Sequence, residues 1–361
     1  MDANEIIFLN ALNSIPGVGV ATLRMLKSRM GSFRDAWHGN ISALAAGSFS
    51  KPIHQIISAR PSLDPEKEFQ KLEQHGIWIM TDEDISFPAL LREIPHPPLF
   101  LYGKGIKPDA VRTHVGIVGT RRPTPYGREV AASITTGLAH QGLVIVSGLA
   151  VGIDTVAHEA ALAAKNPTVA VIGSGIDERS LFPQQNIGLS RRIVEQGGTI
   201  ISEYAPGTPP MKEHFPLRNR IIAGLSRGIF VAEARERSGA LITAQLALDQ
   251  NRDVFAAPGS IFSPSSVGPN LLIQQGAKLI LKTDDILSEW DMQISYTSHT
   301  DSDTNLDNNE KTVLKLLEQE LTIDELSEQT KIQTPILMSL LSLLELKGYV
   351  RQMGNNSYQR V

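Results

Sequence analysis

The chain has 361 residues, which is too long for one ordinary hydrophobic core, so we expect two or three domains. It contains no cysteine, and this excludes disulfides, thiolate nucleophiles and cysteine-based zinc sites. The net charge of −4 argues against a nucleic-acid partner, but residues 112–290 carry a net +2 while the remainder carries −6. A local basic groove and a solvated surface of mixed charge are both compatible with this distribution.

The N-terminal residues, Met1 to Glu5, contain neither the basic region nor the apolar region of a signal peptide. The longest apolar runs are the size of strands, well below the roughly 20 residues that a membrane helix needs. We therefore expect a cytoplasmic protein without a membrane-spanning segment.

Residues 1–60 are predicted to form a small helical domain. A first helix is indicated by apolar residues at helical spacing: Ile6, Phe8, Leu9 and Leu12. The segment Ile15-Pro-Gly-Val-Gly19 then resembles the turn of a helix-hairpin-helix or SAM-like module, whose backbone amides can contact a phosphate. With Lys27 and Arg29 nearby, an auxiliary DNA contact and a purely structural turn both stay open.

Residues 61–290 are predicted to form one α/β domain. Two strands are expected early, at 76–80 and 97–102. Strands and helices then alternate: strand 115–119, helix 127–140, strand 143–147, helix 154–164, strand 168–173, helix 187–196, strand 199–202, helix 219–226, strand 228–232, helix 239–250, strand 253–256, helix 270–275 and strand 278–281. The strands are continuous apolar runs, as strands buried on both faces require. This alternation predicts a mostly parallel sheet with helices on both faces.

The C-terminal part divides into a linker and a small domain. Residues 291–309 are rich in Ser, Thr, Asp and Asn and are predicted to be an acidic flexible linker. Residues 310–361 show three helical segments, one opened by the capping box Thr322-Ile-Asp-Glu325, followed by a short hairpin, which predicts a winged helix. Its third helix offers Gln333, Ser339 and Ser342 but no basic residue before Lys347, which favours a contact with protein over reading of DNA bases.

The loops after the predicted strands are rich in small residues. Ligands of open parallel sheets bind beyond the carboxyl ends of the strands, and small residues there let backbone amides and helix N-termini approach an anion. Four such loops occur: Gly119-Thr-Arg-Arg-Pro123, Ser147-Gly-Leu-Ala-Val-Gly-Ile-Asp154, Gly173-Ser-Gly175 and Arg235-Glu-Arg-Ser-Gly-Ala240. Several arginines in this part of the chain fall beside predicted loops: Arg121, Arg122, Arg218, Arg220, Arg235 and Arg237. Together they predict a phosphate-binding edge.

Known cofactor and catalytic motifs do not fit these loops. The first strand lacks Gly-x-Gly-x-x-Gly, and no Gly-x-x-x-x-Gly-Lys occurs, which disfavours a dinucleotide and a P-loop nucleotide. The histidines show no ligand spacing, so neither a metal nor a cofactor is expected. Asp154 and Glu233 have simple structural interpretations, as a helix N-cap and as the partner of a nearby arginine. We expect no enzymatic activity.

The segment Lys212-Glu-His-Phe-Pro-Leu-Arg-Asn-Arg220 combines cations with an aromatic residue around a predicted proline turn. Proteins that bind single-stranded nucleic acid need cations along the phosphates and an aromatic face for a base. A loop that enters a helix at Asn219, with Phe215 buried, explains the same residues, and the two interpretations stay open.

Several short blocks of the α/β domain form a recognisable set: Gly119-Thr-Arg121, Ser147–Asp154, Gly173-Ser-Gly175, Phe182-Pro-Gln-Gln-Asn186, Phe215–Ser226, Glu233-Ala234, Ser238–Thr243 and Pro258-Gly259. In this order they resemble the DNA-processing protein A family, also called DprA or Smf. The resemblance implies an extended Rossmann-like fold and a homodimer. It also implies binding of incoming single-stranded DNA in natural transformation, its protection, and help in loading the recombinase RecA.

The resemblance also implies which residues form the DNA site. Arg121 and Lys212 would contact phosphates, and Phe215 would contact a base. The loops would contribute Gly119, Thr120, Gly148, Gly173, Ser174 and Gly175, and the Phe215 block would add Arg218, Asn219 and Arg220. A structural role for Arg220, paired with Glu233, is the alternative at that position.

The alternative function is a nucleotide hydrolase of the lysine-decarboxylase-like superfamily. Its Pro-Gly-Gly-x-Gly-Thr-x-x-Glu motif is absent, and the corresponding helix start, Ser238-Gly-Ala-Leu-Ile-Thr-Ala244, lacks the active-site glutamate. A nucleotide-binding sensor is a third candidate.

Overall fold

The computed structural model describes residues 1–108, 111–292, 307–346, 349–354 and 357–360. The chain divides into two compact units, residues 1–294 and residues 295–361, which are described separately below. Most of the predicted linker, residues 291–309, lies outside the described residues. Within the described part of the chain, no helix combines the length and the apolar character that crossing a membrane requires.

The first unit begins with a cluster of helices packed on the first two strands of a large sheet. The helices are α1 (Ala3–Asn13), α2 (Val20–Met30), α3 (Phe33–His38), α4 (Ser50–Ala59) and α5 (Pro65–Gln74). Asn10 of α1 accepts a hydrogen bond from the Tyr102 hydroxyl, at 2.9 Å, which ties the helices to the sheet. Lys27, considered above as an auxiliary DNA contact, instead forms an ion pair with Glu83.

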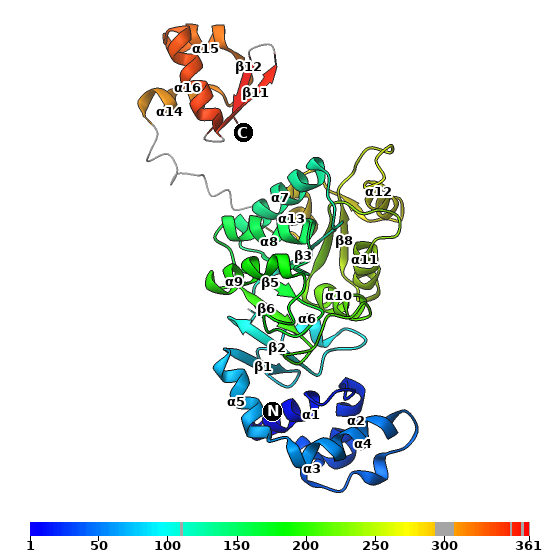
Figure 1. Ribbon diagram of the computed structural model, residues 1–361. Coiled ribbons are helices and arrows are strands. Elements are labelled where there is room, and N and C mark those ends of the chain that lie inside the picture. Colours follow the sequence, from blue (N-terminus) through cyan, green and yellow to red (C-terminus); the bar gives the residue numbers. More distant parts are fainter. Residues whose placement is uncertain (109–110, 293–306, 347–348, 355–356, 361) are drawn as a thin grey trace. The chain divides into compact units, whose positions relative to one another are not determined.

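The centre of the first unit is a nine-stranded sheet of order β1-β2-β6-β5-β4-β3-β7-β8-β9. The strands are β1 (Ile77–Thr81), β2 (Phe100–Gly105), β3 (His114–Val118), β4 (Val144–Ser147), β5 (Thr168–Val171), β6 (Thr199–Ser202), β7 (Gly228–Val231), β8 (Asp253–Ala256) and β9 (Lys278–Leu279). The seven strands β3 to β9 are parallel to one another. At one edge, β2 pairs antiparallel with β6 and β1 pairs antiparallel with β2. The predicted mostly parallel sheet is confirmed, and β1 and β2 extend its Rossmann-like core (Figure 1).

Helices cover both faces of this sheet, as predicted. The bounds are α6 (Ala89–Arg92), α7 (Pro125–His140), α8 (Ile153–Ala163), α9 (Ile187–Glu195), α10 (His214–Leu225), α11 (Gly239–Asp249), α12 (Val267–Gln274) and α13 (Thr283–Glu289). One apolar cluster joins the sheet to α6, α10, α11 and α12, and a second joins it to α7, α8 and α13. Burial of the sheet between these two layers explains its continuous apolar runs.

The direction of the chain reverses at β3. From β3 it proceeds through β4, β5 and β6 on one side, and then returns to place β7, β8 and β9 on the other. In open parallel sheets the crevice outside the carboxyl ends at such a switch point is the usual ligand site. In this protein the crevice lies between the loops that follow β3 and β7.

The structure corrects one prediction that concerns the candidate site. Helix α10 begins at His214, not at Asn219, so Phe215, Pro216 and Arg218 are helical and the predicted proline turn is wrong. Proline is tolerated in the first turn of a helix because its missing N–H would have no partner there. Phe215 therefore projects from the N-terminus of a helix, which holds it more firmly than a turn would.

The second unit is a winged helix, as predicted. It contains α14 (Asn308–Leu316), α15 (Ile323–Thr330) and α16 (Thr334–Leu346), with a three-stranded sheet of β10 (Leu321–Thr322), β11 (Val350–Gly354) and β12 (Ser357–Arg360). The predicted capping box is present, since Thr322 accepts from the Glu325 amide at 3.3 Å and Glu325 accepts from the Thr322 amide at 2.8 Å.

Candidate nucleic-acid interface

A cavity of about 660 Å³ opens at the carboxyl ends of the parallel strands. It is lined by the loop after β3, the N-terminus of α10, and the loop from β7 into α11. Eight of the residues implied by the family resemblance line it or the small cavity beside it: Gly119, Thr120, Arg121, Gly148, Lys212, Phe215, Arg218 and Asn219.

Four cationic side chains line this cavity without an ion-pair partner among the described residues. Arg121, Lys212, Arg235 and Arg237 line it, and all four are exposed. None of them forms an ion pair with any residue that the structure describes. The one acidic residue in the lining, Asp154, is buried. The cavity is therefore a local positive region on a protein whose net charge is negative.

Two phenylalanines form the apolar wall between these cations. The rings of Phe182 and Phe215 are 5.7 Å apart between centroids, and Phe182 is 39% exposed. The Arg121 guanidinium lies 5.7 Å from the centroid of Phe215, within the range of a cation–π contact. Phe215 is half-buried and lines the cavity, so part of its ring is open to a ligand.

A second set of charged groups lies beneath the cavity. Arg218 is only 5% exposed, and its guanidinium donates a hydrogen bond to the carbonyl of Val171 at the end of β5. Burial lowers the pKa of Arg218 to about 10, although the carboxylate of Asp154 opposes this shift. Burial raises the pKa of Asp154, and Arg218 opposes it in turn. The two groups therefore stabilise each other's charged forms inside the protein.

Asp154 and Glu233 have roles that differ from the predicted ones. Gly152, not Asp154, is the N-cap of α8, and the Asp154 carboxylate accepts from the amides of Gly148 and Ala150 at 3.1 and 3.3 Å. Glu233 accepts from the amide and the hydroxyl of Thr124, at 2.9 and 2.6 Å, and is not the partner of an arginine. Both carboxylates thus hold loops at the carboxyl edge in place.

Arg220 and Asn219 are also engaged within the protein. Arg220 forms an ion pair with Glu203, so the predicted pairing with Glu233 is wrong. The Asn219 amide group donates to the carbonyl of Gly239 at 3.4 Å, which links α10 to the start of α11.

The glycines of these loops are required by packing. A Cβ on Gly119 would lie 2.5 Å from a side-chain atom of Ile153, and one on Gly148 would overlap the guanidinium of Arg218. A Cβ on Gly173 would lie 3.1 Å from the ring of Phe215. The small residues therefore let helices α8 and α10 approach the strand ends.

The predicted cradle of backbone amides is wrong at three positions. The amide of Thr120 donates to the carbonyl of Glu233 at 2.7 Å, that of Gly148 to Asp154, and that of Gly175 to the carbonyl of Thr208 at 2.8 Å. Ser174 is 1% exposed. These three amides are therefore engaged within the protein, whereas the four cations of the cavity are exposed.

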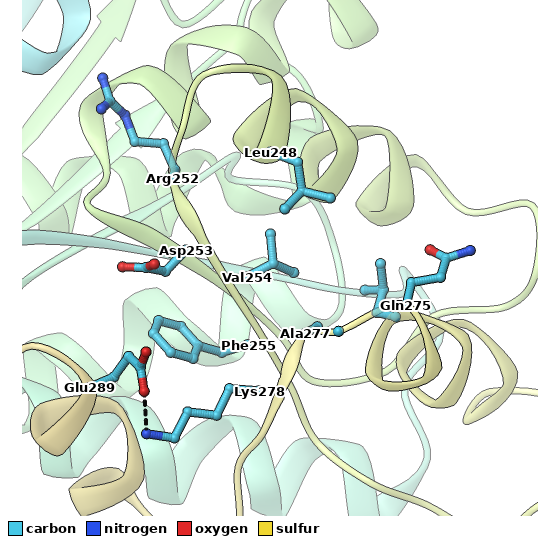
Figure 2. A pocket seen from close by; sticks show the side chains of 11 residues that line it. Leu248, Arg252, Asp253, Val254, Phe255, Gln275, Ala277, Lys278 and Glu289 are labelled. Atoms are coloured by element: carbon cyan, nitrogen blue, oxygen red, sulfur yellow. Dashed lines mark hydrogen bonds and ion pairs between the residues drawn. The ribbon is translucent and has the colours of Figure 1, made fainter.

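A smaller cavity of about 230 Å³, near β8 and β9, shows the opposite arrangement (Figure 2). Its charged side chains are paired: Lys278 with Glu289 at 2.6 Å, Asp253 with the indole N–H of Trp290 at 2.6 Å, and Arg252 with the carbonyl of Leu90 at 2.8 Å. Charges that are satisfied internally leave little to recognise a charged ligand.

Comparison with known proteins identifies the family. Residues 78–291 match the family described as DNA recombination-mediator protein A. The chain belongs to this family. Residues 297–356 match the DprA winged helix domain, in agreement with the second unit. The DNA processing protein DprA of Bacillus subtilis is 43% identical over 252 residues, which is 67% of this chain and 84% of that protein.

Two solved structures of DprA proteins share the fold. The DprA structure from Streptococcus pneumoniae superimposes with a TM-score of 0.66 at 35% identity, over 80% of this chain and 98% of that one. The structure from Helicobacter pylori, from work on that protein's single-stranded DNA binding mode, gives 0.53 at 31% identity, over 60% and 97%. The resemblance inferred from the sequence blocks is confirmed.

Phe182, Arg235 and Arg237 also line the cavity. The family resemblance implied none of the three as a site residue, although the loop that carries the two arginines was part of the predicted phosphate-binding edge. Phe182 belongs to one of the sequence blocks that carry the DprA resemblance, so the sequence could have identified it as a candidate site residue. Arg235 and Arg237 follow β7 at the switch point, on one of the four loops that the sequence predicted to form the phosphate-binding edge.

Proposed function

We propose that this protein binds single-stranded DNA in the cavity at the carboxyl edge of its parallel sheet. The observation that supports this most directly is the group of four exposed cations around Phe182 and Phe215, none of which has an ion-pair partner in the described part of the chain. Exposed cations neutralise phosphates, and a partly open aromatic ring accepts a base. A base inside a duplex is already stacked and cannot reach such a ring, so single strands are favoured.

In this proposal Arg121 and Lys212 contact phosphates on either side of a base that lies on Phe215. The cation–π contact with Phe215 holds the Arg121 guanidinium next to the base site. Arg218, Asn219 and Arg220 support this site from beneath through their contacts with Val171, Gly239 and Glu203. Gly119, Thr120, Gly148, Gly173, Ser174 and Gly175 shape the loops that present it.

The wider role proposed here is that of a cytoplasmic recombination mediator. The protein would protect incoming single-stranded DNA during natural transformation and help to load the recombinase RecA, acting as a homodimer. Family membership and the DNA-binding work on the Helicobacter pylori relative support this role. Assembly of recombinase filaments on DNA with and without this protein tests the loading step, and mass measurement in solution tests the dimer.

Fluorescence anisotropy with labelled oligo-dT tests the DNA site. We expect tight binding of the single strand, weaker binding of its duplex, and loss of binding in Arg121→Ala. Arg34→Ala, which removes an exposed arginine from the N-terminal helices, is the matched control and should bind as the wild type.

A salt series separates a phosphate contact from a loss of folding. Removing one phosphate contact should flatten the slope of log affinity against log salt by about 0.7 for a single strand. If the wild type binds weakly and Arg121→Ala changes nothing, the DNA proposal is wrong, and nucleoside monophosphate hydrolysis becomes the activity to screen.

A further inference from the structure

We infer a second phosphate subsite at Arg235 and Arg237, on the loop between β7 and α11, which extends the DNA path across the switch point of the sheet. This inference rests on the proposed function, because it concerns how the same ligand continues beyond Phe215. The ligand at the subsite is the next phosphate and sugar of the single strand.

The topology of the sheet gives the first argument. Every site residue implied by the family resemblance comes from the loops after β3, β4 and β5 or from α10 and the segment before it. These loops all lie on one side of the switch point, whereas β7 lies on the other. A ligand in the crevice at the switch point meets both sides. The family resemblance implies no contact on the side formed by β7, although the sequence places the loop after this strand in the predicted phosphate-binding edge.

Hydrogen bonds connect the loop after β7 to both parts of the first subsite. The Thr120 amide, next to Arg121, donates to the carbonyl of Glu233 at 2.7 Å, two residues before Arg235. On α10, the side chain of Asn219 donates to the carbonyl of Gly239 at 3.4 Å, two residues after Arg237. These bonds hold the backbone on both sides of Arg235 and Arg237, and both residues line the same cavity as Arg121 and Lys212.

Charge and exposure give the second argument. Arg235 and Arg237 are exposed and line the cavity, and neither forms an ion pair within the described part of the chain. Glu236, between them in sequence, does not line the cavity. Helix α11 has 11 residues and begins directly after this loop, so the positive end of its dipole adds to the two guanidinium groups.

An apolar surface lies beside these arginines. Ile242, on the first turns of α11, lines the cavity and is 46% exposed. A sugar or a base edge of the next nucleotide can rest on it, as the first base rests on Phe215. From β5 to β7 is three strand spacings, about 14 Å, so the two subsites require more than one nucleotide. Affinity should consequently grow with the length of the strand.

The test uses the double variant Arg235→Ala/Arg237→Ala with oligo-dT of about four and about 16 nucleotides. For the long probe we expect affinity to fall on the order of tenfold and the salt slope to flatten by about 1.4. The gain in affinity that the wild type shows from the short to the long probe should largely disappear. Both side chains are exposed, so the temperature of unfolding should stay that of the wild type.

Two further variants make the outcome specific. Arg235→Lys/Arg237→Lys keeps the charges and should keep the salt slope, whereas Arg34→Ala should behave as the wild type with both probes. Wild-type affinity, slope and length dependence in the double alanine variant would overturn the second subsite. If Arg121→Ala still abolishes binding in that case, the proposed function stands, whereas failure of the wild type to bind oligo-dT would refute both.

Discussion

Two layers of cations meet at the carboxyl edge of the sheet, and they differ in what they contact. The upper layer, Arg121, Lys212, Arg235 and Arg237, is exposed and has no acidic partner among the described residues. The lower layer, Arg218 and Arg220, is bound to Val171 and Glu203. Lys212 and both members of the lower layer lie within nine residues of sequence. A basic motif therefore holds two kinds of cation, one available to a ligand and one that supports the site.

Helix geometry explains the division. Arg218 lies three residues after Phe215 on α10, so both side chains lie on the same face of the helix, toward the strand ends. Phe215 stands at the N-terminus and reaches the cavity, whereas Arg218, one turn further, lies beneath it. The absence of a side chain at Gly148 leaves room for the Arg218 guanidinium.

The largest difference between the layers should appear in stability. Arg218→Met removes the charge that faces buried Asp154 and the donor to Val171, and this should lower the free energy of unfolding by about 3 kcal/mol. Arg235→Met, in the exposed layer, should change it by less than about 0.5 kcal/mol. Urea unfolding of the two variants measures both values. Equal stabilities would show that the layers are not distinct.

The next effect concerns the aromatic wall and should appear in DNA binding. Phe215→Leu keeps an apolar side chain but removes the ring on which a base stacks, so affinity for oligo-dT should fall by about 1–3 kcal/mol. The salt slope should stay that of the wild type because no cation is removed. Phe215→Tyr keeps the ring and is the matched control. A flattened slope in Phe215→Leu would mean that Phe215 acts by positioning Arg121.

The sequence predicted the strands of the sheet and the blocks of the site, but it could not show which cations are exposed and which are bound within the protein. Glu203 and Glu233 both follow strand ends, and the sequence offered no way to choose between them as the partner of Arg220. The partner of Arg220 depends on where α10 packs, and the packing depends on where α10 begins. The sequence suggested a turn at Pro216, whereas the helix begins at His214. The prediction that the loop amides are free to bind an anion was wrong for a similar reason. Their acceptors, on Glu233, Asp154 and Thr208, come close only in the folded tertiary structure.

The buried side chain of His158, which belongs to neither layer of cations, should make the free energy of unfolding depend on pH. His158 is buried, its Nδ1 lies 2.9 Å from the hydroxyl of Thr168, and burial lowers its pKa to about 3, with a smaller contribution from Arg218. An unfolded histidine has a pKa of about 6.5, so as pH falls below this value the unfolded state takes up a proton that the folded state does not. Stability should therefore be fully present above about pH 6.5 and fall by about 1.4 kcal/mol per unit below it.

Urea unfolding at neutral pH and at about one unit below 6.5 tests this dependence. In His158→Gln the loss over this interval should be absent, although the variant starts from a lower stability. Burial raises the pKa of Asp154 and Glu203, so their protonation as pH falls favours the folded state and opposes the effect of His158. The difference between the wild type and His158→Gln isolates the contribution of the histidine. His96→Gln, at an exposed position, should keep the wild-type dependence. An unchanged slope in His158→Gln would contradict this assignment.

The smallest effect tests whether the exposed cations attract the DNA strand at long range through their electrostatic field, in addition to contacting it directly. Glu236 lies between Arg235 and Arg237 in sequence, is exposed, and does not line the cavity. Glu236→Gln removes one negative charge from the region without adding a cation that could contact the strand, so the association rate with oligo-dT should rise by about twofold at low salt. The increase should vanish at high salt, where the Debye length is shorter than the distance to the strand.

Stopped-flow measurements on Glu236→Gln and on Glu73→Gln, which changes an exposed carboxylate on α5, separate this local field from the net charge. Equal rates for both variants would assign the positive region to direct contacts alone, as expected if the four cations reach the phosphates only after the strand has docked.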